Sequence, residues 1–263
     1  MKNKILSQIN AECPWRDTLH WYDTLESTNI RAKELAKADA PHGTVVIAGS
    51  QTGGRGRMGR SFLSPAGGVY LSVILRPACP PDRLMHLTCA AATAGCIAVE
   101  RACGICPDIK WTNDLVYGKK KLGGILTELV LRTDGAVEAA IIGIGINCKK
   151  ATDFPPELQA TVTSIQEISS AGCTADALTA KLVEALWKMD KELFTGKQEM
   201  MAYYRRRCIT LGKEIKILTG DTVQYGIALD LDENGGLLVR FTDGSEKIVA
   251  SGEVSIRGLY GYL

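Results

Sequence analysis

Apolar positions recur along this chain in two rhythms, and each rhythm predicts a different kind of element. Apolar residues spaced three and four apart are typical of a helix with one buried face, whereas short β-branched runs are typical of strands. The helical rhythm predicts helices over residues 24–39, 83–103 and 175–193, and a shorter helix that ends near residue 208. The β-rich runs predict strands over residues 44–48, 69–75, 125–131 and 137–146, and a hairpin that joins 108–111 to 115–117.

The first predicted helix has a recognisable start and a recognisable buried face. Ser27 or Thr28 is a good N-cap, because a hydroxyl oxygen can accept a hydrogen bond from a free backbone N–H of the first turn. Ala32, Leu35 and Ala36 follow at helical spacing and form its apolar stripe. We therefore expect this helix to begin at the ESTN sequence of residues 26–29.

The pattern changes twice in the second half of the chain. Residues 150–173 hold two adjacent prolines and many Ser and Thr, which predicts a loop or a mobile segment. From residue 212 on, five short β-rich runs alternate with tight turns, which predicts a small β-barrel of SH3-like size. We place a domain boundary near residue 210, between 1–210 and 211–263. The larger part mixes helices with strands that look mainly antiparallel, so an α+β fold is favoured over a doubly wound α/β fold.

Composition narrows the class of protein. The chain has 263 residues, of which 46% are hydrophobic, and this is enough apolar material for a sizeable core. Its net charge is only +2, from 31 Lys and Arg against 29 Asp and Glu, which excludes a globally basic nucleic-acid binder. The longest apolar stretch, residues 84–99, is shorter than the about 20 residues that cross a bilayer, and the N-terminus lacks the apolar run of a signal peptide. We expect no membrane partner.

The nine cysteines are scattered, mostly within apolar segments. Free cysteines often behave as small buried hydrophobic residues, so we expect core or incidental thiols and a reducing, cytoplasmic location. Cys103 and Cys106 form a single C-x-x-C pair, without the second pair of ligands that a structural zinc site needs.

The most informative stretch is the loop GGRGRMGR of residues 53–60. It contains the letters of a dinucleotide-binding fingerprint, but a strand follows it where that fold needs a helix. Its glycines free backbone N–H groups to surround a ligand, and its arginines offer fixed donors to carboxylate and phosphate. A ligand with two anionic groups would suit this loop. A solvated basic loop and an RNA-binding Arg-Gly tract remain alternatives for the loop taken alone.

Two further segments point to a site. KWTND at 110–114 is followed by KKKLGG at 119–124, and Lys121 stands at the margin of an apolar run, where it can point into a pocket. The sequence GIGIN at 143–147 ends the last predicted strand of the larger part, and its alternating glycines leave one strand face bare. Either a flat ligand or close packing against a helix would fill that face.

These motifs together resemble biotin–protein ligases. ESTN at 26–29, the loop at 53–60, KWTNDLVYGKKKLGGILTEL at 110–129 and GIGIN at 143–147 occur in the order of that family. The resemblance runs from near residue 20 to the C-terminus. Thr112 stands where the family usually has Pro, and Phe62 stands where Trp is common. About 20 residues precede the first motif, which is too few for the DNA-binding domain of some relatives, so we expect no DNA binding.

The resemblance implies a mixed-sheet catalytic domain like that of class II aminoacyl-tRNA synthetases, with a small SH3-like barrel after it. It also implies a reaction in which biotin and ATP form biotinyl-5′-AMP, which a lysine of a biotin carboxyl carrier protein then attacks. Mg²⁺ is the expected cation. A lipoate–protein ligase is the nearest alternative, and a non-enzymatic RNA-binding module is a distant one. A homodimer paired through a strand edge is expected by family and symmetry.

The resemblance also assigns roles to individual residues. Lys121, Arg57 and Asp114 would be catalytic, with Asp114 the candidate ligand for Mg²⁺. Biotin would be bound by Ser27, Thr28, Asn29, Gln51, Arg55, Gly56, Arg57, Lys121 and Gly124. ATP and the adenylate would be bound by Arg55, Arg57, Lys110, Asn113, Lys121, Asn147 and Arg257. Because the scheme has no covalent enzyme intermediate, no Ser or Cys nucleophile is required.

Overall fold

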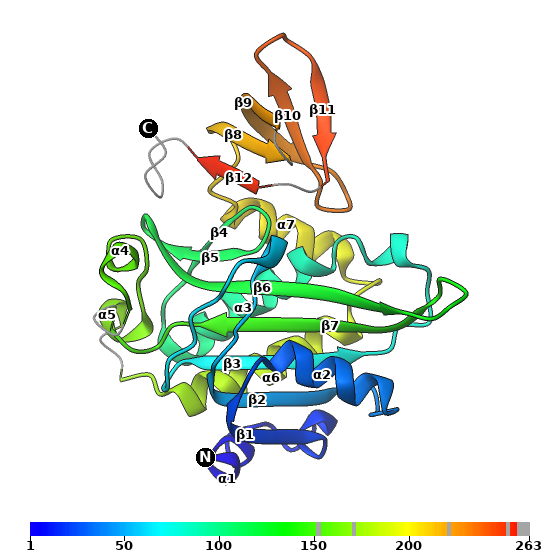
Figure 1. Ribbon diagram of the computed structural model, residues 1–263, viewed down its shortest axis with the longest axis vertical. Coiled ribbons are helices and arrows are strands. Elements are labelled where there is room, and N and C mark those ends of the chain that lie inside the picture. The colour runs from blue at the N-terminus through cyan, green and yellow to red at the C-terminus, as the bar shows by residue number, and fades with distance from the viewer. Residues whose placement is uncertain (151–153, 170–171, 220–221, 251–252, 257–263) are drawn as a thin grey trace.

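Two β-sheets organise the molecule in a computed structural model that describes residues 1–150, 154–169, 172–219, 222–250 and 253–256 (Figure 1). The larger sheet has seven strands in the order β1-β2-β3-β7-β6-β5-β4. Its strands are β1 Leu19–Leu25, β2 Thr44–Gln51, β3 Val69–Leu75, β4 Asp108–Lys110, β5 Asp114–Tyr117, β6 Lys120–Leu131 and β7 Val137–Ile146. The β1–β2 pair is parallel and the other pairs are antiparallel, which makes the sheet mixed.

Helices cover both faces of this sheet, which is why β3 is buried along its whole length. Alternate β3 residues, Val69 to Leu75, belong to the main core, under α1, α3, α6 and α7. Ile74 faces the other way, into a smaller cluster with Ala32 and Ala36 of α2. The helices are α1 Lys2–Leu6, α2 Thr28–Lys37, α3 Leu87–Cys103, α4 Pro156–Gln159, α5 Ile165–Ile168, α6 Ala175–Lys191 and α7 Lys197–Arg207, with 3-10 turns η1 Pro14–Arg16, η2 Arg57–Gly59 and η3 Pro81–Leu84.

The second sheet is antiparallel, with the strand order β11-β10-β9-β8-β12. Its strands are β8 Glu214–Thr219, β9 Thr222–Leu231, β10 Leu237–Phe241, β11 Glu246–Val249 and β12 Glu253–Ile256. The turn between β9 and β10 joins it to the first sheet and α7. Trp111 Nε1 donates to the Gly235 carbonyl at 2.8 Å, and Lys197 Nζ donates to Asn234 Oδ1 at 2.9 Å. The small sheet therefore sits above the β4–β5 edge (Figure 1).

The predicted α+β class, a mixed-sheet domain followed by a small β domain, is confirmed. Several element boundaries differ from the prediction. The helix predicted from residue 83 begins at Leu87, because η3 precedes it, and β6 begins at Lys120 rather than at residue 125. Ser27 occupies the N-cap of α2, but its side chain makes no capping hydrogen bond. The edge strand β1 has no counterpart in the sequence prediction.

The segment predicted as a loop over 150–173 is partly regular where the structure describes it. It contains the short helices α4 and α5, and a bridge pairs Val162 with Lys121 of β6. Of residues 1–150, 154–169, 172–219, 222–250 and 253–256, none belongs to a helix long and apolar enough to cross a membrane.

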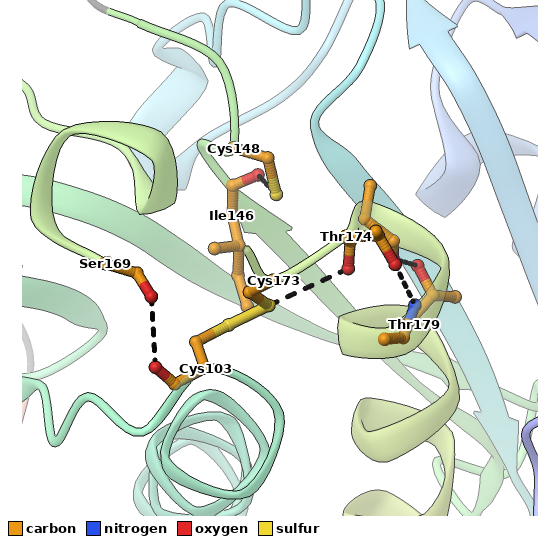
Figure 2. The surroundings of a disulfide bond; sticks show 9 residues. Cys103, Ile146, Cys148, Ser169, Cys173, Thr174 and Thr179 are labelled. Atoms are coloured by element: carbon orange, nitrogen blue, oxygen red, sulfur yellow. Dashed lines mark hydrogen bonds between the residues drawn. A yellow bond between two sulfur atoms is a disulfide. The ribbon is translucent and has the colours of Figure 1, made fainter. Parts of the chain in front are cut away.

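The expectation of free thiols is wrong for two cysteines. A disulfide joins Cys103, at the end of α3, to Cys173, just before α6, with their Cα atoms 5.0 Å apart (Figure 2). The Ser169 hydroxyl donates to the Cys103 carbonyl at 3.1 Å beside this bridge. The thiol prediction is confirmed for the free cysteines, which are Cys13, Cys79, Cys89, Cys96, Cys106, Cys148 and Cys208.

Candidate active site

One cavity gathers most of the side chains that the sequence analysis singled out. It lies beside the start of α2, the loop between β2 and β3, and the ends of β4 to β7, and it encloses about 960 Å³ of empty space, part of it open to solvent. The predicted site residues that line it are Ser27, Thr28, Asn29, Gln51, Arg55, Gly56, Arg57, Lys110, Asn113, Asp114, Lys121 and Gly124. The fold therefore brings residues that are more than 90 positions apart in the sequence to one cavity.

The start of α2 forms the uncharged end of the cavity. Thr28 is buried, and its backbone N–H donates to Gln51 Oε1 at 2.8 Å. Gln51 Nε2 in turn donates to Ser64 Oγ at 2.7 Å, which fixes the Gln51 amide. This end offers hydroxyl and amide groups, which suit a neutral polar ring with N–H and C=O groups.

The Arg-Gly loop folds back on itself as an irregular hairpin. The Gly56 N–H donates to the Arg60 carbonyl at 2.7 Å, and the Phe62 N–H donates to the Gly54 carbonyl at 2.8 Å. Gly59 has a φ of 75°, a left-handed conformation that glycine adopts at little cost. Arg57 reaches across the cavity, where its guanidinium donates to Asn113 Oδ1 at 3.3 Å. The hairpin thus brings cations to the rim.

Lys121 and Asp114 form an ion pair within the cavity wall. Lys121 Nζ lies 2.6 Å from Asp114 Oδ1, and both side chains are mostly shielded from solvent. The backbone of Lys121 is held on its outer side, because its N–H donates to the Thr161 carbonyl and its carbonyl accepts from the Thr163 N–H, each at 2.8 Å. The ammonium group is therefore fixed at one place in the wall.

The bare strand face of GIGIN is filled by side chains of this chain. The Asn29 side chain lies over Gly143, and the Phe62 ring lies over Gly145, so a Cβ at either glycine would overlap its neighbour. Phe62 also stands 5.9 Å from Lys121 Nζ, measured to the ring centroid. The two glycines are required by close packing, and the Phe62 ring forms one side of the cavity.

Two predicted site residues are not among those that line the cavity. Asn147 is buried, and its Nδ2 donates to the Thr163 carbonyl at 3.2 Å, while its Oδ1 finds no partner in the described part of the chain. Arg257 lies outside the described residues, so its predicted contact with pyrophosphate stays a prediction.

The structure adds residues that the sequence analysis did not name. Ser72, in β3, bonds to both Thr28 and Asn29, and Glu128, in β6, bonds to Asn29. The signal for Ser72 was one polar residue inside the apolar run VYLSVIL. The sequence indicated Glu128 only as a carboxylate inside GGILTEL. The alternation of side chains along a strand does not tell which face of the sheet it occupies.

Two buried cysteines are poor nucleophiles. Burial raises the pKa of the Cys148 thiol to about 12, and burial raises the pKa of the Cys89 thiol to about 12 as well. Both thiols stay protonated at neutral pH, and a protonated thiol is the unreactive form. The cations and donors described above can instead position and neutralise anionic groups.

Comparison with known proteins gives this arrangement a family. Residues 21–147 match the model of the biotin/lipoate A/B protein ligase family, and residues 210–257 match the biotin protein ligase C-terminal domain.

Relatives of known name share both parts of the chain. The bifunctional ligase/repressor BirA of Bacillus subtilis is 37% identical over 89% of this chain and 72% of its own length. The biotin–[acetyl-CoA-carboxylase] ligase of Mycobacterium tuberculosis is 30% identical over 94% of this chain and 91% of its own. A biotin protein ligase from Aquifex aeolicus, solved with biotin and ATP, is 30% identical, has a TM-score of 0.77 and matches 91% of this chain and 98% of its own. The chain therefore belongs to the biotin protein ligase family.

Proposed function

We propose that this protein is an ATP-dependent ligase that activates biotin as biotinyl-5′-AMP and transfers the biotinyl group to a lysine of a carrier protein. The observation that carries the proposal is a single cavity with a neutral hydrogen-bonding end and a cationic end. Biotin has the same polarity, because a ureido ring stands at one end of the molecule and a carboxylate at the other. The similarity to ligases named for biotin favours biotin over lipoate.

The neutral end would hold the ureido ring of biotin. The groups available there are the hydroxyls of Ser27 and Thr28 and the amides of Asn29 and Gln51. The carboxylate would then point toward Arg55, Arg57 and Lys121, with Gly56 and Gly124 allowing close approach of the backbone. These cations offset the repulsion between a carboxylate and a triphosphate, which is the main obstacle to the first step.

The two steps need no covalent bond to the enzyme. In the first, a biotin carboxylate oxygen attacks the α-phosphorus of ATP, and the bond to pyrophosphate breaks. In the second, the acceptor lysine amine attacks the biotinyl carbonyl carbon, loses a proton, and AMP leaves. Lys121, held by its backbone beside Asp114, would stabilise the charge that develops on the carboxyl oxygen in both steps.

ATP would occupy the region of Lys110 and Asn113, with Asn147 and Arg257 as further predicted contacts. The unpartnered Oδ1 of Asn147 is suited to accept a hydrogen bond from adenine. Asp114 is the one carboxylate that lines the described cavity, and no group of three metal-binding side chains occurs in the described part of the chain. This donor set fits a Mg²⁺ ion that is bound mainly by the phosphates of ATP, with Asp114 as one protein ligand. The ion would neutralise phosphate charge.

The acceptor and the setting follow from the same proposal. A biotin carboxyl carrier domain is the proposed acceptor, in keeping with relatives named for acetyl-CoA carboxylase. We propose a reducing, cytoplasmic location because seven cysteines are free, and the Cys103–Cys173 bridge is the exception to that pattern. We also propose a homodimer through the edge of the seven-stranded sheet, where β1 is the outermost strand.

The test is exchange of labelled pyrophosphate into ATP by the purified protein, with biotin or with lipoate. Biotin-dependent exchange is expected, and lipoate should support at most a small fraction of it. Transfer is then measured as the mass gain of an added carrier domain. Absence of exchange with biotin would exclude the proposed activity, and equal exchange with both acids would exclude the proposed specificity.

A further inference from the structure

A row of three residues crosses the sheet beneath the start of α2. Leu126 of β6 pairs with Gly143 of β7, and Gly143 pairs with Ser72 of β3. The Asn29 side chain spans this row and lies directly over Gly143, which has no Cβ to block it. Asn29 and Ser72 are both buried, so their hydrogen-bonding groups must find partners within the protein.

The orientation of the Asn29 amide is fixed by what surrounds it. Its Nδ2 donates to Glu128 Oε2 at 2.8 Å and to the Leu126 carbonyl at 3.3 Å. Both partners can only accept, so the reversed amide would set its own oxygen against a carboxylate and a carbonyl. Lys33 holds the carboxylate in place, with its Nζ 2.5 Å from Glu128 Oε1. Asn29 Oδ1 is therefore directed at Ser72.

Ser72 has one hydroxyl hydrogen and faces two oxygens. It donates to Asn29 Oδ1 at 2.6 Å and lies 2.8 Å from Thr28 Oγ1. An amide oxygen has no hydrogen to give, so the shorter contact requires the Ser72 hydrogen. The Ser72 hydroxyl therefore donates only weakly, if at all, to Thr28 Oγ1.

The Thr28 hydroxyl hydrogen is thereby kept inside the protein. It points to Gln51 Oε1 at 3.1 Å. Ser72 Oγ, 2.8 Å away, is a second acceptor for it, because the Ser72 hydrogen is committed to Asn29; a turn toward the cavity would leave both acceptors without a hydrogen from Thr28. Thr28 therefore presents a lone pair, and not an O–H, to a ligand in the cavity.

We propose that Glu128 is a positioning residue that acts through Asn29 and Ser72 to make the Thr28 hydroxyl an acceptor for a ligand N–H. This inference rests on the proposed function, since the ligand N–H would be a ureido N–H of biotin. Glu128 would thus help the ligase to prefer a ligand ring with an N–H donor opposite Thr28 over a ring with a hydrogen-bond acceptor there.

The experiment replaces Glu128 by Gln, which keeps the size of the side chain and adds an N–H donor. The Gln Nε2 can donate to the oxygen of a reversed Asn29 amide, which removes the shorter of the two contacts that fix the amide and leaves only the 3.3 Å contact with the Leu126 carbonyl. Asn29 can then donate to Ser72, and Ser72 can give its hydrogen to Thr28. The Thr28 hydrogen is then held by Gln51 Oε1 alone, at 3.1 Å, and can turn to the cavity. Binding is measured by calorimetry for biotin and for an analogue whose ureido N–H groups are replaced by oxygen.

The wild type should bind biotin and reject the analogue, because two acceptors would meet at Thr28. In Glu128→Gln we expect about a tenfold loss of biotin affinity, which corresponds to one hydrogen bond to a charged network, and a smaller preference for biotin over the analogue. KM for biotin should rise about tenfold, while kcat and the KM for ATP change less than about twofold. The control is Glu34→Gln, the same change on the exposed side of α2, which should match the wild type.

If Glu128→Gln lowers affinity for both ligands by the same factor, Glu128 has only a structural role and the proposal is wrong. If that variant does not fold, Ser72→Ala decides, because it removes the hydroxyl through which Asn29 acts on Thr28. Its preference for biotin must fall, and an unchanged preference overturns the proposal. Failure of the wild type to bind biotin would instead contradict the proposed function.

Discussion

The contacts at the backbone and at the ammonium group of Lys121 place this residue where it can neutralise the charge of a bound carboxylate. Its backbone is tied to the segment that carries Thr161 and Thr163, and its ammonium lies against Asp114. A partly shielded lysine held by one carboxylate can transfer its donors to a second carboxylate with little movement. We infer that the Asp114 pair keeps Lys121 in position until a ligand carboxylate arrives.

Removal of this ammonium should affect chemistry far more than folding. Lys121→Ala is expected to lower biotin-dependent ATP–pyrophosphate exchange about 10²–10³-fold, the usual effect of losing one donor to a developing charge. The thermal unfolding midpoint should move by only a few degrees. Lys120→Ala is the matched control, since the neighbouring lysine is exposed, and it should keep full exchange. Full exchange in Lys121→Ala would remove Lys121 from the site.

At the level of single residues, the sequence predicted the charged and polar side chains of the cavity better than their partners. From the family motifs, we predicted that the start of α2, the Arg-Gly loop and Lys121 belong to one site. They could not predict that Phe62 fills the space over Gly145, or that Ser72 supplies a hydrogen to Asn29. Such contacts depend on which strands become neighbours, and that order is absent from local patterns.

The Arg-Gly loop is largely exposed, and few hydrogen bonds within it hold its shape. Met58 and Arg60 are exposed, and the turn is closed by bonds between backbone groups of residues 54–62. Three arginines within six residues repel one another when no anion lies between them. We therefore expect the loop to open readily without ligand and to close over biotin or its adenylate.

Limited trypsin digestion tests this expectation. Cleavage after Arg55, Arg57 or Arg60 should be fast in the free protein and slowed at least about fivefold by saturating biotin, because ligand binding lowers the population of the open form. Cleavage after Arg132, in the exposed turn between β6 and β7, provides an internal reference and should not change. Equal cleavage of the loop with and without biotin would contradict closure.

Elements were predicted well where one buried face repeats and poorly where tertiary contacts define them. The helix α6 and the central strands β3 and β7 match their predicted ranges within two residues, and α3 begins four residues later than predicted. The start of β6 could not be predicted, because Lys119 to Lys121 look like a solvated run and pairing with β5 makes the last part of it a strand. The segment 154–169 is similar, because its order comes from contacts with Lys121 and Asn147 rather than from its own composition.

For the whole molecule, the Cys103–Cys173 bridge, drawn in Figure 2, closes the chain segment between two residues that are 70 positions apart in the sequence. That segment contains β4 to β7 and the residues that flank Lys121. Cross-linking a loop of this length restricts the unfolded chain and stabilises the folded state by roughly 4 kcal/mol in the chain-entropy description. The bridge therefore contributes a large part of the 5–15 kcal/mol that is typical of a folded protein.

Cys173→Ser should lower the free energy of unfolding by up to about 4 kcal/mol in urea without reductant. The wild type should fall to nearly the same value in excess dithiothreitol, whereas the variant should not respond. Cys79→Ser, which changes a partly exposed free thiol, should stay within about 0.5 kcal/mol of the wild type. Alkylation in denaturant should label seven cysteines before reduction and nine after it. If nine are labelled before reduction, the purified protein has no bridge, and Cys173→Ser should then leave the free energy of unfolding unchanged.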